Sequence, residues 1–258
     1  MTITLTVYKG YLIDLDGTIF RGDEVIPGAV EFIQKLIEKQ LPYVFITNNS
    51  SYTAGLLIDK LKKMNIPAKK ENILTSSIAT AKYLKQSKEQ VRCFTIGEIG
   101  LKQALKDENI MITNQDVTHV VMGIDRQITY DKLAMATDFV NNGATLVSTN
   151  KDLAIPSETG YKPGNGALTS VVSLSSGKEP LFIGKPAKNI IQIGLNMLNC
   201  KAEEVLLIGD NYFTDITGGI DSGVDTAFVL TGIGQRTDII NKMQPTYVLN
   251  NLLDYHLK

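Results

Sequence analysis

Short apolar runs alternate with amphipathic stretches along most of the chain. The runs predict strands at residues 11–13, 43–46, 72–75, 181–183, 205–208 and 226–230. The C-terminal runs are apolar throughout, as strands covered on both faces are. Apolar residues at helical spacing predict helices at 28–40, 56–64, 78–84 and 187–198. Strand, helix, strand in this order predicts right-handed crossovers and an α/β fold with a doubly wound, mostly parallel sheet.

The middle of the chain has an alternation of its own. It predicts strands at 91–96, 119–122 and 145–148, and helices at 101–106, 130–141 and 168–174. The flanking segments 85–89 and 175–180 are polar and rich in turn residues, as linkers are. We therefore expect a core domain made of residues 1–84 and 179–258, with residues 85–178 inserted as an α/β cap domain.

Composition excludes several classes of protein. The 258 residues carry a formal net charge of −1, which argues against a nucleic-acid partner. No apolar run approaches the roughly 20 residues of a membrane helix, so no membrane partner is expected. Residues 1–6 lack the features of an export signal, and Cys93 and Cys200 show no paired spacing. These observations predict a cytoplasmic protein.

Polar functional groups come directly after several of the apolar runs. In an open parallel sheet, ligands bind outside the carboxyl ends of the strands, so these groups are expected to share one crevice. They are Asp14 and Asp16 after the first run, Thr47 after the second, Lys185 after residue 183, and Asp210 with Asp215 after residue 208.

The acidic residues among them predict a metal site. Asp14 and Asp16 are two residues apart, and Asp210 adds a carboxylate from another strand. Close carboxylates repel and need a cation. An all-oxygen donor set favours Mg²⁺. A His-ligated zinc site is not expected, because His119 and His256 lie far from these motifs.

Thr47 and Lys185 add a hydroxyl and an ammonium to the same crevice. A substrate that bridges Mg²⁺, an ammonium and a hydroxyl is most simply a phosphoryl group. One Asp carboxylate can attack phosphorus and form an aspartyl-phosphate. The second can protonate the leaving oxygen and then deprotonate the attacking water.

Taken together, these motifs resemble those of the haloacid dehalogenase-like superfamily. Residues 14–18, Thr47, 184–186 and 209–215 match its four motifs in order. The chain is most similar to the NagD-like, 4-nitrophenylphosphatase-type phosphatases, which have a large insert between the second and third motifs. That similarity extends through residues 14–22, 46–50 and 75–81.

The resemblance implies a role for each acidic residue. Asp14 is expected to be the nucleophile and a Mg²⁺ ligand. Asp16 is expected to be the general acid and base, with its backbone carbonyl on the metal. Asp210 would complete the metal site and Asp215 would support it. By itself, Asp215 could equally be a first-turn acid favoured by a helix dipole.

The resemblance also assigns the substrate contacts. Thr47 and Asn48 are expected to hold phosphoryl oxygens, and Lys185 to stabilise their charge. The insert would act as the cap that excludes water and selects the leaving group. Members of this type often have Asn-Pro-Asp in a cap loop, where this chain has Asn150-Lys151-Asp152. Residues 160–166 could be another cap loop that reaches the site or a plain loop.

The expected function is Mg²⁺-dependent hydrolysis of small phosphate monoesters, such as sugar phosphates, nucleoside monophosphates or 4-nitrophenyl phosphate. The substrate would be a small phosphorylated metabolite. Two alternatives stay open: a phosphotransferase that uses the same aspartyl-phosphate, and a non-hydrolytic sensor of phosphorylated metabolites. The pair of Asp14 and Asp16 argues against the sensor, which has no need of both.

Overall fold

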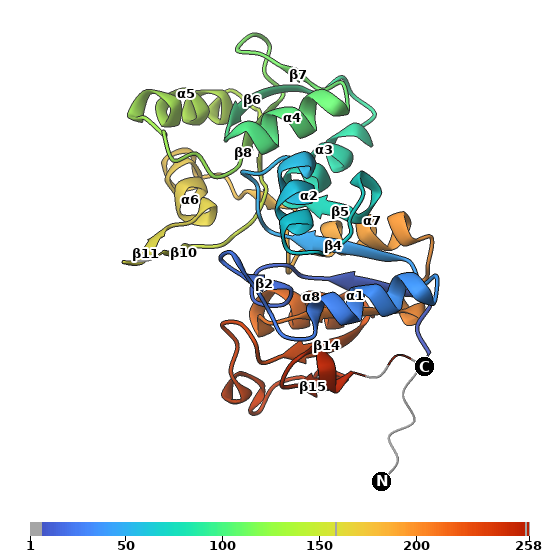
Figure 1. The fold of residues 1–258 in the computed structure, drawn as a ribbon. Helices are drawn as coiled ribbons and strands as arrows, with labels where there is room; N and C mark the ends of the chain where they lie inside the picture. Colours follow the sequence, from blue (N-terminus) through green and yellow to red (C-terminus); the bar gives the residue numbers. More distant parts are fainter. Residues whose placement is uncertain (1–6, 158, 256, 258) are drawn as a thin grey trace. The chain divides into compact units, whose positions relative to one another are not determined.

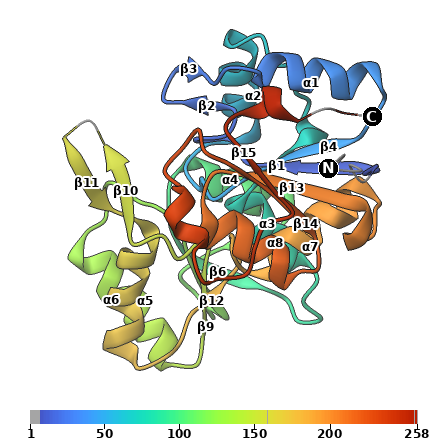
Figure 2. The same cartoon turned by 90° about the horizontal axis from the view of Figure 1, so that it is seen from below.

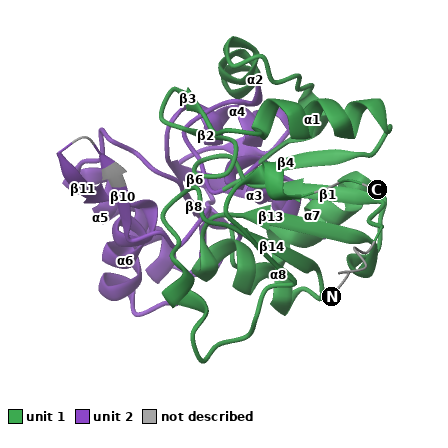
Figure 3. Ribbon diagram, turned by 60° about the horizontal axis from the view of Figure 1, so that its bottom comes forward, with its two compact units in different colours: residues 1–47, 55–74, 185–258 green, residues 48–54, 75–184 purple. Residues whose placement is uncertain are grey.

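The computed structural model describes residues 7–157, 159–255 and 257. The chain forms two compact units, coloured separately in Figure 3. Unit 1 contains residues 1–47, 55–74 and 185–258, and unit 2 contains residues 48–54 and 75–184. Two features discussed above, the segment 1–6 and His256, lie outside the described residues.

Unit 1 is built around a six-stranded sheet in the order β15-β14-β13-β1-β4-β5. All the strand pairs from β15 to β4 are parallel. The strands are β1 (Gly10–Ile13), β4 (Tyr43–Thr47), β5 (Ile73–Thr75), β13 (Val205–Gly209), β14 (Asp225–Val229) and β15 (Tyr247–Leu249). The central strand β1 therefore pairs with one strand from each end of the sequence.

Helices cover both faces of this sheet, which is why β1 is buried at every position. Successive strand residues point to opposite faces. Tyr11 packs edge-on against Phe32, and Leu12 lies against Gly194. Figure 2 accordingly shows α1 on one side and α7 and α8 on the other. The helices are α1 (Ala29–Glu38), α2 (Ala54–Lys63), α7 (Lys188–Leu198) and α8 (Thr217–Asp221).

Unit 2 has a parallel sheet of its own, in the order β12-β9-β8-β6-β7. Its strands are β6 (Arg92–Ile96), β7 (Met111–Ile112), β8 (His119–Met122), β9 (Thr145–Ser148) and β12 (Leu181–Phe182). Its helices, coloured cyan to yellow in Figure 1, are α3 (Ser76–Lys85), α4 (Ile99–Asp107), α5 (Tyr130–Asn141) and α6 (Asn165–Ser176). Apolar side chains of these elements, including Val120 and Val140, form its core.

Short elements complete the chain. Two small hairpins pair β2 (Phe20–Arg21) with β3 (Glu24–Val25), and β10 (Ala154–Ser157) with β11 (Gly160–Pro163). Single helical turns are η1 (Lys70–Asn72), η2 (Ala202–Glu204), η3 (Tyr212–Ile216), η4 (Arg236–Ile239) and η5 (Leu252–Asp254). The segment 160–166 is thus a strand followed by the start of α6, and not a plain loop.

The α/β class and the mostly parallel sheets agree with the sequence analysis. However, the boundaries of the two units differ from those expected for the core and cap domains. Strand β12, expected in the C-terminal part of the core, pairs with β9 in the sheet of unit 2. Helix α3 packs on α4 and belongs to unit 2 as well. In the described part of the chain, no helix has the length and apolar character needed to cross a membrane.

Candidate active site

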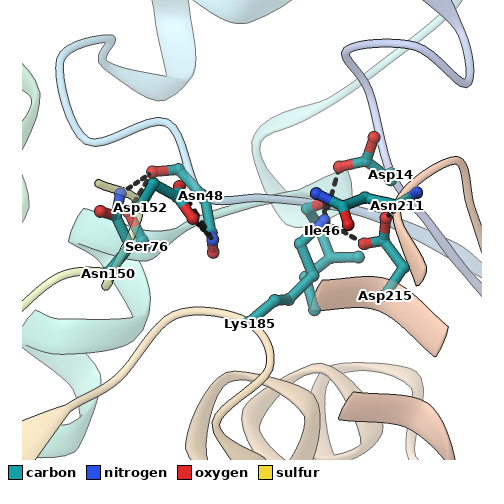
Figure 4. A network of polar contacts seen from close by, with 9 residues as sticks. All are labelled: Asp14, Ile46, Asn48, Ser76, Asn150, Asp152, Lys185, Asn211 and Asp215. Atoms are coloured by element: carbon teal, nitrogen blue, oxygen red, sulfur yellow. Dashed lines mark hydrogen bonds and ion pairs between the residues drawn. The ribbon is translucent and has the colours of Figure 1, made fainter. Parts of the chain in front are cut away.

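Lys185 links two carboxylates of unit 1 (Figure 4). Its ammonium donates to Asp14 Oδ1 at 2.5 Å, to Asp215 Oδ1 at 2.6 Å and to the carbonyl of Ile46 at 3.1 Å. Asp14 directly follows β1, Ile46 belongs to β4, and Asp215 lies beyond β13. Segments at the ends of three strands thus supply acceptors to one ammonium, as expected where the carboxyl ends of parallel strands lie together.

Asp210 follows β13 and is held by the loop after β14. The backbone N–H of Ile233 donates to its Oδ2 at 2.7 Å, and Gly234 N–H donates to its carbonyl at 3.1 Å. Any side chain at Gly232 would overlap the Asp210 carboxylate. The backbone of this loop therefore approaches the carboxylate as closely as it does because residue 232 is glycine.

Asp215 sits on η3, a single turn of π-helix, a feature that is frequent at functional sites. Asn211 N–H donates to its Oδ2 at 3.1 Å, while its other oxygen accepts from Lys185. The side chain is 1% exposed, so both oxygens are used inside the protein. The Asp215 carboxylate is thus fixed by Lys185 and by the backbone of Asn211 at the same time.

Asp16 lies two residues beyond Asp14 but differs from it in exposure. Asp14 is buried, whereas Asp16 is solvent-accessible. The protein around Asp16 nevertheless desolvates the carboxyl enough to raise its pKa, against the opposing charges of Lys60 and Lys185. Thr47, the last residue of β4, is buried. Strand β1 ends at Ile13 and does not continue through Asp16.

Burial and mutual repulsion set the protonation of the cluster. Burial raises the pKa of Asp14 well above its ordinary value, although Lys185 opposes the shift. Burial and the charge of Asp215 raise the pKa of Asp210 to about 7. Burial alone would lower the pKa of Lys185, but the charges of Asp14 and Asp215 outweigh it and raise the pKa. The single positive charge of Lys185 therefore does not balance the negative charge of these buried carboxylates.

A divalent cation would supply the positive charge that these carboxylates lack. Asp14, Asp210 and Asp215 each offer one carboxylate oxygen, and these oxygens lie within 4.8 Å of one another. All three residues are buried. Hard cations such as Mg²⁺ prefer oxygen ligands of this kind. The donor set therefore fits a divalent metal, and two of its members, Asp14 and Asp215, also accept hydrogen bonds from Lys185.

Asn48 belongs to unit 2, unlike the other predicted site residues. Its side-chain amide donates to Asp152, and its carbonyl accepts from Ser76 and Asn150 (Figure 4). His119 is half-buried at the start of β8, with its Nδ1 2.9 Å from Thr118 Oγ1.

Two features of the site went unnoticed in the sequence. The first is the loop of residues 231–234, which begins two residues after the end of β14 and could have been found by searching the polar segments that follow strands. The second is Lys60, whose charge opposes the rise that burial causes in the pKa of Asp16, and whose ammonium lies 4.3 Å from the centre of the Phe20 ring. The basic end of α2 looks like an ordinary solvated helix terminus, so no sequence signal marked Lys60.

Comparison with known proteins identifies the family to which a chain with this site belongs. The model of the family "haloacid dehalogenase-like hydrolase" matches residues 11–111, and a second "HAD-hydrolase-like" model matches residues 182–255. The 5'-nucleotidase YutF of Bacillus subtilis is 44% identical over 252 residues, which are 97% of this chain and 98% of that protein.

Two further proteins extend the comparison. The acid sugar phosphatase of Staphylococcus aureus strain MRSA252 is 46% identical over 247 residues, covering 95% of each chain. The structure of NagD from E. coli K-12 superposes with a TM-score of 0.93 at 30% identity, covering 98% of this chain and 100% of NagD. The chain therefore belongs to the haloacid dehalogenase-like hydrolases and is a phosphatase of the NagD-like subgroup.

Proposed function

We propose that the chain hydrolyses small phosphate monoesters in a Mg²⁺-dependent reaction, through an aspartyl-phosphate on Asp14. The observation that carries this proposal is the buried cluster of Asp14, Asp210 and Asp215, with the Lys185 ammonium on two of its members. It combines a carboxylate nucleophile, oxygen ligands for a hard cation and a fixed positive charge. These are the groups that phosphoryl transfer requires.

The reaction has two steps. A carboxylate oxygen of Asp14 attacks phosphorus, and the bond from phosphorus to the ester oxygen breaks while Asp16 donates a proton to that oxygen. Asp16 then takes a proton from water, whose oxygen attacks phosphorus. The bond to Asp14 breaks and inorganic phosphate leaves. The raised pKa of Asp16 supports its role as the acid of the first step.

Other residues stabilise charge and position the phosphoryl group. Lys185 would neutralise a phosphoryl oxygen, and the Thr47 hydroxyl and Asn48 would hold the others. The carboxylates of Asp14 and Asp210, with the backbone carbonyl of Asp16, would hold Mg²⁺, while Asp215 supports the site. When bound, Mg²⁺ supplies further neutralisation of the phosphoryl charge.

The proposed substrates are small phosphorylated metabolites, either sugar phosphates or nucleoside monophosphates. The names of the Bacillus and Staphylococcus relatives support both classes. Residues 85–178 would act as the cap that selects the leaving group. Neither nucleic acid nor membrane is a proposed partner. A cytoplasmic location is part of the proposal, in line with the free thiols of Cys93 and Cys200.

The first test measures hydrolysis of 4-nitrophenyl phosphate by wild type, Asp14→Asn and Asp59→Asn, each with Mg²⁺ and with a chelator. Asp59 is an exposed aspartate of α2 and serves as the matched control. We expect Mg²⁺-dependent turnover in wild type and Asp59→Asn, and a loss of at least about 10³-fold in Asp14→Asn. Full activity of Asp14→Asn would contradict the assignment of the nucleophile.

A second test addresses the intermediate. Several phosphate monoesters are hydrolysed in the presence of an added alcohol, and phosphate and alkyl phosphate are quantified. A shared aspartyl-phosphate predicts the same product ratio for every leaving group. A ratio that follows the leaving group would contradict it. Dominant transfer to the alcohol or to a sugar would indicate the phosphotransferase instead.

A further inference from the structure

The end of β4 is followed by a residue whose polar groups are held by a loop of unit 2. Asn48 comes directly after Thr47, and its Nδ2 lies 3.2 and 3.3 Å from the two carboxylate oxygens of Asp152. Its carbonyl accepts from Ser76 Oγ at 2.8 Å and from Asn150 Nδ2 at 2.6 Å. Both the backbone and the side chain of Asn48 are thus engaged (Figure 4).

The loop that carries Asp152 is itself fixed from behind by the start of α6. The N–H of Gly166 donates to the Asp152 carbonyl at 2.9 Å, and a side chain at residue 166 would overlap the Lys151 carbonyl. Asn165, which is 2% exposed, places its Nδ2 3.3 Å from the Asn150 carbonyl. The Asp152 carboxylate is therefore presented to Asn48 from a rigid support.

Asn165 also connects this loop to the end of β9. Its Nδ2 lies 2.9 Å from Ser148 Oγ and 3.1 Å from Thr149 Oγ1. This explains the segment 160–166, whose role the sequence left open. Its final residues hold the Asn150-Lys151-Asp152 loop by backbone and side-chain hydrogen bonds.

We infer that Asp152 is a positioning residue for phosphoryl binding and acts through the side-chain amide of Asn48. The inference rests on the proposed function, in which Asn48 contacts a phosphoryl oxygen. A carboxylate on one side of the amide fixes its rotamer and its O/N orientation. It also polarises the amide, which strengthens any further hydrogen bond that its N–H groups donate.

The physical gain is preorganisation. An unrestrained Asn side chain would have to be ordered each time phosphate binds, and this cost lowers affinity. Asp152 imposes the order beforehand without touching the substrate. Its removal should therefore weaken phosphate binding more than it slows the chemical step, because Asp14, Asp16 and Lys185 remain in place.

The experiment compares Asp152→Ala, Asp152→Asn, Asn48→Ala and the double variant Asn48→Ala/Asp152→Ala in the full chain with Mg²⁺. For each, kcat and KM for 4-nitrophenyl phosphate are measured, and the Kd of inorganic phosphate is determined by calorimetry. We expect Asp152→Ala to raise both KM and Kd about tenfold, the effect of one charge-assisted hydrogen bond, with a smaller change in kcat. Asp152→Asn keeps a carbonyl acceptor and should show a smaller effect.

The double variant provides the decisive comparison. If Asp152 acts through Asn48, the double variant should bind phosphate as weakly as Asn48→Ala alone. Additive losses would overturn the inference, because they would show that Asp152 acts on the substrate independently. Equal phosphate affinity of Asp152→Ala and wild type would overturn it too.

Controls separate this inference from general damage and from the proposed function. Asp138→Asn, at an exposed position of α5 in the same unit, should leave both constants unchanged. Thermal unfolding of every variant checks for loss of structure. Absence of Mg²⁺-dependent turnover in wild type would count against the proposed function alone. The calorimetric comparison still decides the role of Asp152 in that case, and wild type that does not bind phosphate would overturn it.

Discussion

The two units contain parallel sheets of the same kind but place different chemistry at their strand ends. In unit 1, Asp14 and Asp210 follow β1 and β13, and Lys185 joins the cluster they form. In unit 2, β9 is followed by Thr149 and Asn150, and neutral hydroxyl and amide groups bond to one another there. The ends of β1 and β13 thus gather buried charge, whereas the end of β9 gathers neutral dipoles.

The difference shows that a parallel sheet determines where the residues after its strands lie, whereas the chemistry at that edge depends on their side chains. Buried charges cost free energy of desolvation that their mutual attraction repays only in part. The charge cluster of unit 1 is therefore kept at the expense of stability. The neutral network of unit 2 can be satisfied by hydrogen bonds alone and serves to hold a loop.

The largest effect is expected when the cation of the charge cluster is removed. Lys185→Met leaves two buried carboxylates without their partner and should lower the free energy of unfolding by about 3–5 kcal/mol. Turnover should fall by about 10³-fold or more. Lys82→Met is the matched control in unit 2, because the side chains of Lys82 and its partner Glu108 are 40% and 28% exposed, so that no buried carboxylate is left behind. Its cost should stay below about 1 kcal/mol.

Urea denaturation and 4-nitrophenyl phosphate hydrolysis measure both effects. Equal destabilisation by the two lysine variants would remove the contrast between the units.

A smaller effect is expected at Gly232. Gly232→Ala forces the loop after β14 away from Asp210 and disturbs the hydrogen bond from Ile233. Because such supporting contacts tune metal affinity, the Mg²⁺ concentration for half-maximal activity should rise about 10–100-fold. A Mg²⁺ titration of activity measures the shift. An unchanged midpoint would show that this loop does not position Asp210.

The neutral network of unit 2 should be affected in stability more than in chemistry. Asn165→Leu removes the hydrogen bonds that its Nδ2 donates to buried oxygens of Met122, Ser148 and Thr149, and should lower the free energy of unfolding by about 2 kcal/mol. Asn141→Ala, at an exposed position of α5, should change it by less than about 0.5 kcal/mol. Chemical denaturation compares the two. A loss in Asn165→Leu no larger than in the control would mean that the network contributes no net stability.

The smallest effect concerns pH. Although desolvation opposes the shift, hydrogen bonds from Lys132 and Gln127 hold the pKa of Asp125 below its ordinary value of 3.8. A carboxyl whose pKa is lower in the folded protein than in the unfolded chain stabilises the fold when the pH is above the unfolded-state pKa. This contribution is lost as the pH falls through the folded-state pKa. Asp125→Asn should thus be less stable than wild type by up to about 1 kcal/mol at pH 7. The gap should close below about pH 4. Denaturation at both pH values tests this, and a gap that widens in acid would contradict the sign.

The sequence predicted those elements whose residues are uniformly apolar or periodic. Strand β1 and helix α1 were predicted almost to the residue, because burial on both faces or on one face leaves a clear pattern. The hairpin of β10 and β11 was missed, since all four residues of β11 are exposed and no core face imposes a period. Strand β12 was predicted, but two half-buried residues cannot specify which sheet they join.

The site residues that could be predicted are those located just after the ends of strands. Lys185, Asp14 and Asp215 meet as expected, because a parallel sheet brings its carboxyl ends together. The partner of Asn48 could not be predicted, since Asp152 lies more than a hundred positions away and only the fold brings them together. Lys60 could not be found either, because its effect on Asp16 acts across space.

The pairing of β1 with β13 also bears on how the protein is made. Gly10 lies opposite Val205, so the central strand waits for a partner that is synthesised almost two hundred residues later. Pairing across such a sequence separation is slow and leaves strand edges open to misassociation while the chain is incomplete. Unit 2 comes mostly from one continuous segment and can close earlier. During translation, all of unit 2 is therefore synthesised before Lys185, Asp210 and Asp215, so the buried charge cluster of unit 1 can form only after unit 2 is complete in sequence.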